Sequence, residues 1–200
     1  MKKRIAILLS GRGSNFEAIA RNVACGAIDA TIAVIISNRP GAPGLEIAKQ
    51  LGLEAVVFPS QGLQREPYDT LLVTELQRRE VDLVCLAGFM RFLSPVFVRA
   101  FPNRILNIHP SLLPSFPGLE AQRQALEHGV KISGCTVHFV DEDLDHGPII
   151  LQTAVPVEDG DTVETLSARI LVEEHRIYTA AINLVLSDSV RVENRRVIRK

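Results

Sequence analysis

Short apolar runs alternate with helical patterns through the first half of this chain, and this order limits the possible folds more than any other feature. In sequence order, the runs and the helical patterns cover residues 4–9, 14–24, 31–37, 43–51, 54–58, 68–80 and 82–87. The apolar runs are short and continuous, which is typical of parallel strands with both faces buried. Parallel strands need crossover segments, and helices usually supply them. The first half is therefore predicted to be a parallel sheet with helices.

The second half predicts a different arrangement. Its expected elements are a strand over 104–108, a helix over 122–128, extended runs over 133–140 and 148–157, a helix over 162–186 and an edge strand over 190–198. Pro110, Pro114 and Pro117 exclude regular structure from the loop after the first strand. The two extended runs are joined by an acidic loop and are expected to pair. Asp161 and Glu164 match a reciprocal capping pattern at the start of the long helix.

Together these elements predict an α/β fold. We expect a Rossmann-like, open, mostly parallel, twisted sheet with helices on both faces, and an antiparallel strand pair in the C-terminal part. No linker or repeat interrupts the 200 residues, of which 46% are hydrophobic. The sequence therefore predicts one domain over residues 1–200.

Composition excludes several classes of protein. The net charge is -1, whereas nucleic-acid surfaces are usually strongly basic, so no nucleic-acid partner is expected. The three cysteines lie far apart without a CxxC pair, which argues against a zinc site or disulfides. The apolar run over 5–9 is too short for a secretory signal, and no run approaches the roughly 20 residues of a membrane span. We expect a cytoplasmic protein without a membrane partner.

A glycine-containing loop, Ser10-Gly-Arg-Gly-Ser-Asn15, follows the first predicted strand. Ligands of open α/β sheets bind at the carboxyl ends of strands, and the N-terminus of the next helix suits phosphate. Phe16 replaces the third glycine of a dinucleotide fingerprint, and no GK[ST] follows, so neither that motif nor a P-loop is present. The loop is interpreted as a phosphate site, with a plain strand–helix turn as the alternative.

Asn107 and His109 stand two residues apart at a predicted strand end. Residues at this spacing share one face of a strand, and an amide beside an imidazole can bind an oxygen that becomes negative. A structural histidine at a turn is the alternative. We hypothesise that Asp145, from the acidic loop, orients and charges His109. His138 lies within a predicted strand and is compatible with the site or the core.

The acidic loop itself reads Asp-Glu-Asp-Leu-Asp-His-Gly over residues 141–147. Its aspartates have calcium-loop spacing. The glycine falls one place late, however, and Gln152 occupies the twelfth position, so a calcium site is not expected. Cys135 lacks an obvious base and is assigned to the core.

Several stretches together resemble the phosphoribosylglycinamide formyltransferases, a family of folate-dependent enzymes. They are ILLSGRGSN, LAGFMRFLSP, ILNIHPSLLPSFPG, SGCTVHFVDEDLDHGPIILQ and EEHRIY, and the resemblance runs nearly end to end. It implies formyl transfer from 10-formyltetrahydrofolate to glycinamide ribonucleotide in purine synthesis, with no metal and by a monomer or homodimer. It also implies that residues from about 1 to 100 bind the nucleotide and phosphate, and that those from about 101 to 200 bind folate and carry catalysis.

The resemblance assigns roles residue by residue. Catalysis falls to Asn107, His109 and Asp145. The nucleotide substrate is assigned to Gly13, Ser14, Asn15 and Glu174. The folate is assigned to Arg65, Met90, Arg91, Phe92, Leu93, Asn107, Asp141, Glu142, Asp143, Leu144 and Asp145.

The chain departs from the family pattern at three positions outside the catalytic set. Glu120 stands where members often have His, Thr179 where they often have Pro, and His146 replaces a small residue. Rival functions are a methionyl-tRNA formyltransferase or a formyltetrahydrofolate hydrolase, both of which use the same Asn–His–Asp set. A non-catalytic nucleotide-binding protein on the same scaffold is the rival from another class.

Overall fold

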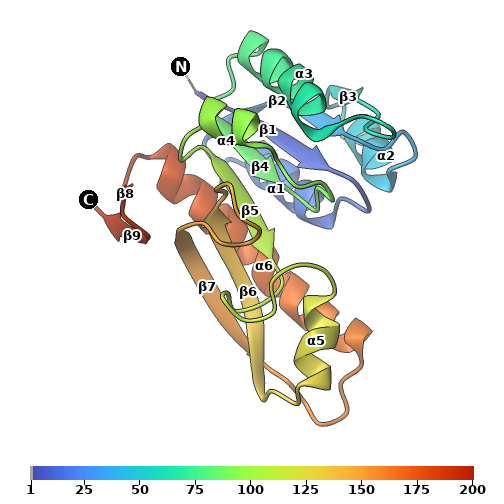
Figure 1. The fold of residues 1–200 in the computed structure, drawn as a ribbon, viewed down its shortest axis with the longest axis vertical. Helices are drawn as coiled ribbons and strands as arrows, with labels where there is room; N and C mark the ends of the chain where they lie inside the picture. Colours follow the sequence, from blue (N-terminus) through green and yellow to red (C-terminus); the bar gives the residue numbers. More distant parts are fainter. Residues whose placement is uncertain (1) are drawn as a thin grey trace. The chain divides into compact units, whose positions relative to one another are not determined.

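The computed structural model describes residues 2–200, which divide into two compact units (Figure 1). The first unit ends at Leu106 and the second runs from Asn107 to Lys200. The predicted open α/β fold, with a mostly parallel sheet, helices on both faces and an antiparallel C-terminal strand pair, is confirmed.

The first unit is built around parallel strands in the order β3-β2-β1-β4. Their bounds are β1 Lys3–Leu9, β2 Ala30–Ser37, β3 Ala55–Val57 and β4 Leu83–Leu86. In β1, every side chain from Ile5 to Leu9 is completely buried, as expected of a central strand covered on both faces. The continuous apolar run in the sequence is explained by this two-sided burial.

Helices connect these strands and cover the sheet. Their bounds are α1 Ser14–Ala24, α2 Pro43–Gln50, α3 Arg65–Arg78 and α4 Pro95–Ala100. α1 packs against α2 and α3 packs against α4. The strand order reverses at β1, because β2 and β3 lie on one side of it and β4 on the other. Open α/β sheets commonly bind ligands at such a switch point, which here lies at the carboxyl ends of β1 and β4.

The second unit has strands in the order β5-β6-β7-β9-β8. The bounds of its elements are β5 Ile105–His109, α5 Ala121–Glu127, β6 Ile132–Phe139, β7 Ile149–Pro156, α6 Val163–Leu186, β8 Val190–Glu193 and β9 Arg196–Arg199. β6 and β7 are antiparallel, and α6 packs on both of them. β9 runs parallel to β7 and antiparallel to β8.

Three details of the sequence-based prediction were wrong. The edge strand expected over 190–198 is instead the hairpin β8–β9, whose turn contains Asn194 in the left-handed region. The cap of α6 is Thr162, which exchanges hydrogen bonds with Thr165, whereas Asp161 and Glu164 were expected to form it. Helix α4 was not predicted, because its six residues are rich in β-branched and aromatic types that favour strands.

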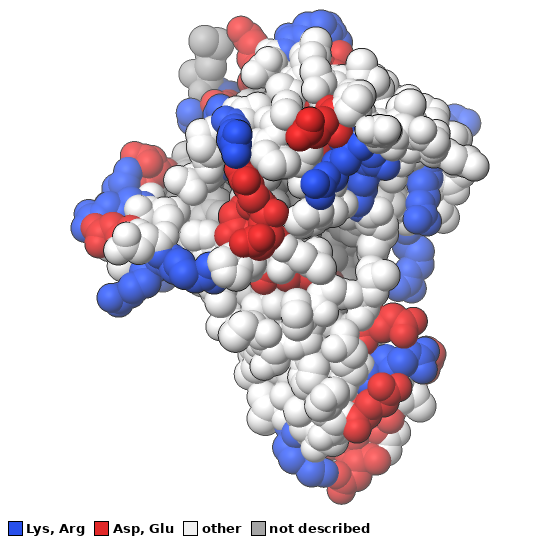
Figure 2. Space-filling view, viewed as in Figure 1, with Lys and Arg blue, Asp and Glu red and all other residues white. Residues whose placement is uncertain are grey.

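No helix within residues 2–200 combines the length and the apolar character needed to cross a membrane. All three cysteines are free, with Cys25 exposed and both Cys85 and Cys135 buried. On the face drawn in Figure 2, Lys and Arg side chains are interspersed with Asp and Glu.

Candidate active site

The loop after β1 is tied to the loop after β4 by Ser10. Its hydroxyl accepts a hydrogen bond from the Met90 backbone N–H at 2.7 Å and donates to Asn38 Oδ1 at 2.6 Å. Its own N–H donates to the Gly88 carbonyl at 3.0 Å. These contacts bring the predicted phosphate loop and the start of the predicted folate segment to the same edge of the first unit, as adjacent parallel strands require.

Gly13 occupies the cap position of α1 with φ +83°, in the left-handed region that favours glycine. A Cβ there would also lie 2.9 Å from the Gly44 Cα, so this position has no room for a side chain. Ser14 and Asn15 follow as the first helical residues and are half-buried. The helix N-terminus and two polar side chains therefore share one short segment, an arrangement that suits an anion.

The predicted folate residues of the first unit lie together at the start of α3 and in the loop after β4. The Arg65 guanidinium lies 4.9 Å from the centre of the Phe92 ring, and that of Arg91 lies 4.4 Å from the centre of the Tyr68 ring. Met90 and Phe92 are exposed, whereas Leu93 is buried. Exposed apolar side chains beside guanidinium groups can contact a ring system that carries acidic groups.

Asp69 fixes the end of this loop from inside the first unit. It is completely buried, and its Oδ2 accepts the Ser94 backbone N–H at 2.5 Å. Burial raises the pKa of its carboxyl above the usual range, partly offset by that hydrogen bond. Sequence reasoning missed Asp69, because it looks like one of many charged residues on a surface helix.

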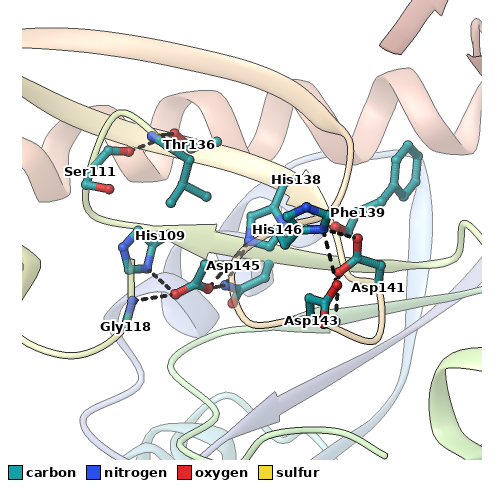
Figure 3. A network of polar contacts seen from close by, with 12 residues as sticks. His109, Ser111, Gly118, Thr136, His138, Phe139, Asp141, Asp143, Asp145 and His146 are labelled. Carbon is teal, nitrogen blue, oxygen red and sulfur yellow. Dashed lines mark hydrogen bonds and ion pairs between the residues drawn. The ribbon is translucent and has the colours of Figure 1, made fainter. Parts of the chain in front are cut away.

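In the second unit, β5 presents Asn107 and His109 to one carboxylate. Asp145 Oδ2 lies 3.4 Å from His109 Nδ1 (Figure 3). Asp145 Oδ1 accepts from Asn107 Nδ2 at 3.5 Å. Asp145 Oδ2 also accepts the Gly118 backbone N–H at 2.8 Å. The side chains of His109 and Asp145 are only 6% and 10% exposed. The structure therefore brings together the three residues that were predicted to carry catalysis.

His109 has both ring nitrogens engaged. Nδ1 faces Asp145, and Nε2 lies 2.8 Å from the Phe116 carbonyl oxygen. A carbonyl can only accept, so Nε2 carries the hydrogen in this contact. The histidine is thus held at both ends, by the acidic loop and by the proline-containing loop.

His138 on β6 is a further member of the cluster. The sequence alone did not decide whether this residue belongs to the site or to the core. Its Nδ1 donates to the Phe139 carbonyl at 2.8 Å, so Nε2 is free to accept from Asn107 Nδ2 at 3.3 Å. Asp145 Oδ1 lies 3.8 Å from the same Nε2. Burial lowers the pKa of His138, and its hydrogen bond to the Phe139 carbonyl and the nearby Asp145 charge only partly counter this effect. His138 is therefore a neutral acceptor that orients the Asn107 amide.

This neutral histidine predicts a pH-dependent stability. Between the lowered pKa of folded His138 and the value of about 6.5 in the unfolded chain, the unfolded state binds more protons. Stability is therefore lost as pH falls below about 6.5 towards the lowered pKa of the folded state. Urea unfolding at several pH values should show His138→Gln losing less stability on acidification than wild type. The exposed His128→Gln should keep the wild-type pH dependence, and an identical slope in His138→Gln would contradict the assignment.

The acidic loop is closed tightly at its base. The Phe139 N–H donates to the Pro148 carbonyl at 2.9 Å, and a Cβ on Gly147 would lie 1.9 Å from the Phe139 oxygen. Asp145 itself adopts a left-handed φ of 49°. The other residues predicted to bind folate here differ in burial: Asp141 is half-buried, whereas Glu142, Asp143 and Leu144 are exposed.

Glu174 lies on α6 and is buried, at 7% exposure. It contributes to a raised pKa of about 12 for Cys135, whose main cause is burial of the thiol. Cys135 is therefore an inert core residue rather than a nucleophile. Within residues 2–200, no three His, Cys, Asp or Glu side chains gather as a metal site would require.

Comparison with known proteins gives one consistent family. The sequence model described as formyl transferase matches residues 3–182. Phosphoribosylglycinamide formyltransferase of Escherichia coli is 46% identical over 90% of this chain and 85% of its own length. The crystal structure of glycinamide ribonucleotide transformylase 1 from Symbiobacterium toebii superposes with a TM-score of 0.96, at 55% identity, over 99% of this chain and 94% of that one.

A longer relative is similar over one segment only. The trifunctional purine biosynthetic protein adenosine-3 of Bos taurus is 48% identical over 98% of this chain. The chain spans 20% of the length of that protein. The similarity therefore concerns one part of the bovine protein.

Proposed function

This chain belongs to the formyl transferase family, and we propose that it transfers the formyl group of 10-formyltetrahydrofolate to the amine of 5'-phosphoribosylglycinamide. The products are formylglycinamide ribonucleotide and tetrahydrofolate, in a step of purine synthesis. The observation that carries the proposal is the buried Asp145 carboxylate between Asn107 and His109. We also predict that the protein is cytoplasmic and that it is a monomer or a homodimer.

The proposed chemistry begins with attack of the substrate amine on the formyl carbon. A carbon–nitrogen bond forms, and the carbonyl electrons move onto oxygen. Asn107 Nδ2 and a ring N–H of His109 donate to this oxyanion, and such donors are often the largest electrostatic term in acyl transfer. The bond from carbon to the folate nitrogen then breaks. The proton lost by the amine reaches that nitrogen through Asp145 and water, so atoms and charge balance.

The donors need small rearrangements to reach the oxyanion. Asn107 Nδ2 is 3.3 Å from His138 and 3.5 Å from Asp145, and hydrogen bonds this long are readily exchanged for a better-placed acceptor. His109 Nε2 would exchange the Phe116 carbonyl for the formyl oxygen, while Nδ1 stays beside Asp145. Asp145 then supports the positive imidazolium and holds the ring in place.

Substrate contacts follow from the same proposal. The nucleotide phosphate and ribose are assigned to Gly13, Ser14 and Asn15, and the glycinamide part to Glu174. The folate is assigned to Arg65, to the segment from Met90 to Leu93, to Asn107 and to the loop from Asp141 to Asp145. Support comes from the close packing at Gly13, where a Cβ would lie 2.9 Å from the Gly44 Cα, and from the position of Ser14 and Asn15 at a helix N-terminus. The exposed Met90, Phe92 and Leu144 side chains support the folate assignment.

The phosphate assignment predicts separate effects on the two substrates. Asn15→Ala should weaken binding of the nucleotide by about 1–3 kcal/mol, the usual contribution of a hydrogen bond to a charged group. Calorimetry should show an unchanged affinity for a folate analogue. Asn22→Ala, the same substitution later on α1, is the matched control and should leave both affinities unchanged. Equal losses for both ligands in Asn15→Ala would contradict the assignment.

The main rival is hydrolysis of 10-formyltetrahydrofolate, since water can replace the amine at the same site. Purified protein should consume 10-formyltetrahydrofolate rapidly only when glycinamide ribonucleotide is present. Consumption at the same rate without the nucleotide would favour the hydrolase. Consumption that depends on an aminoacylated tRNA would favour the tRNA formyltransferase, and no turnover with any of these would favour a binding protein.

A further inference from the structure

The C-terminal hairpin β8–β9 meets the base of the acidic loop. Arg196, the first residue of β9, pairs in parallel with Ile149, the first residue of β7. Arg195 therefore lies beside the last residues of the loop. This hairpin falls outside residues 3–182, the part of the chain that matches the formyl transferase family.

Arg195 contacts His146 in two places. Its Nη2 donates to the His146 carbonyl at 2.6 Å, and its Nη1 lies 2.6 Å from Nε2 and 2.9 Å from Nδ1 of the His146 ring. The ring Nδ1 lies 3.0 Å from Asp141 Oδ2. A carboxylate only accepts, so Nδ1 carries the hydrogen in its contact with Asp141. A guanidinium only donates, so Nε2 is the ring acceptor for Arg195, and the approach of Nη1 to Nδ1 is proximity without a hydrogen bond. A continuous set of contacts thus joins the hairpin, through His146, to the start of the acidic loop (Figure 3 shows the contact between His146 and Asp141).

The residue held in this way is the neighbour of Asp145. Asp145 has a left-handed φ of 49°, which is uncommon outside glycine although aspartate adopts it more readily than most residues, and contacts on both sides help to hold it. On one side, Gly118 donates to its carboxylate. On the other, Arg195 fixes the carbonyl of His146, the next residue. We propose that Arg195 is a positioning residue, which holds the acidic loop through His146 so that Asp145 stays beside Asn107 and His109.

Two effects follow if Arg195 is removed. The loop gains freedom, because the two contacts to His146 are lost while the closed base at Phe139 and Pro148 remains. The Asp145 carboxylate then lies beside Asn107 and His109 for a smaller fraction of the time, and the loop backbone proposed to bind folate is less ordered. This second effect rests on the proposed function, whereas the first does not.

Hydrogen exchange of the ligand-free protein tests the contact without reference to activity. In Arg195→Ala, amides of residues 141–147 should exchange roughly 2- to 5-fold faster, the factor that corresponds to the usual energies of exposed ionic contacts. The matched control is Arg191→Ala on the same hairpin, where Arg191 pairs with the exposed Glu193. It should leave the loop unchanged, and β6 amides should be unchanged in both variants. Unaltered loop exchange in Arg195→Ala, or an equal increase in Arg191→Ala, would overturn the proposal.

Steady-state kinetics test the positioning role. Arg195→Ala should lower kcat and raise the KM for 10-formyltetrahydrofolate, each by roughly 3- to 10-fold, with the KM for the nucleotide within about twofold of wild type. Arg195→Lys keeps the charge but cannot reach the ring and the carbonyl with two separate nitrogens, so it should resemble Arg195→Ala. Full recovery by Lys, or unchanged kcat and folate KM despite faster exchange, would show that Arg195 does not position Asp145.

His146→Ala gives an independent variant should Arg195→Ala fail to fold. It removes the ring contact and leaves the carbonyl, so its effects should be smaller and in the same direction. His146→Ala should change the exchange rate and kcat less in the Arg195→Ala background than in wild type, because the two residues share one contact. Additive effects would overturn the proposal. An enzyme that is inactive on the nucleotide would refute the proposed function, and the exchange experiment would still decide whether the contact exists.

Discussion

Replacing Asp145 by Asn is expected to lower kcat by roughly 10²-fold or more, since a charge that supports a protonated histidine is lost. The substitution nearly preserves shape, and the amide oxygen of the introduced side chain can still accept the Gly118 N–H that now binds Asp145 at 2.8 Å. The amide cannot offer acceptors to both Asn107 and His109, as the two carboxylate oxygens do. Rapid-quench measurement of a single turnover should therefore show a slower chemical step.

The control for this variant is Asp159→Asn, an exposed residue that pairs only with Lys131 among the described contacts. It should keep wild-type turnover. Near-native circular dichroism and urea unfolding of Asp145→Asn would show that the fold is kept. Turnover of Asp145→Asn within about threefold of wild type, which is under roughly 1 kcal/mol of barrier, would reduce Asp145 to an ordinary loop residue.

The second large effect concerns the two donors on β5. Asn107→Ala and His109→Ala should each lower kcat by roughly 10²- to 10³-fold, the usual loss when one oxyanion donor is removed. The KM values should change less, because these interactions are made chiefly in the transition state. Folate binding, measured by fluorescence of an analogue, should weaken more for Asn107→Ala, whose amide is also assigned to the folate.

The double variant sharpens this prediction. Residues that act on the same oxygen are strongly non-additive, so Asn107→Ala combined with His109→Ala should lose much less than the product of the single losses. Near-full turnover of either single variant would show that its residue is structural and that the proposed chemistry is wrong. Fully multiplicative losses would argue that the two side chains act in separate steps.

Much of the fold was predictable because its signals are local and periodic. Strand β1 is buried on both faces, so its sequence is a continuous apolar run. Helix α1 is buried along one stripe, so its apolar residues recur at helical spacing. Helix α4 shows no such pattern, since six residues span fewer than two turns. The turn at Asn194 was missed because alternation continues across it, so one strand and a hairpin look alike.

The site was predictable only in part, for a different reason. Asn107 and His109 are two residues apart, so strand geometry alone places them on one face. Asp145 could be named as their partner only as a hypothesis, because a loop residue reaches them through tertiary structure. The sequence left His138 open between site and core, and Asp69 was missed. Their roles depend on burial and on groups far along the chain, the Asn107 side chain and the Ser94 backbone N–H. Arg195 is 49 residues from His146, and no local pattern links the two.

The central claim is that the formyl group goes to an amine and not to water, and the fate of a labelled formyl carbon tests this most directly. The protein should be incubated with 10-[¹³C-formyl]tetrahydrofolate and glycinamide ribonucleotide, and the products resolved by NMR. Our account predicts that the label appears in formylglycinamide ribonucleotide in equal amount to the tetrahydrofolate released, with little formate. Label recovered chiefly as formate, with the nucleotide unchanged, would contradict it.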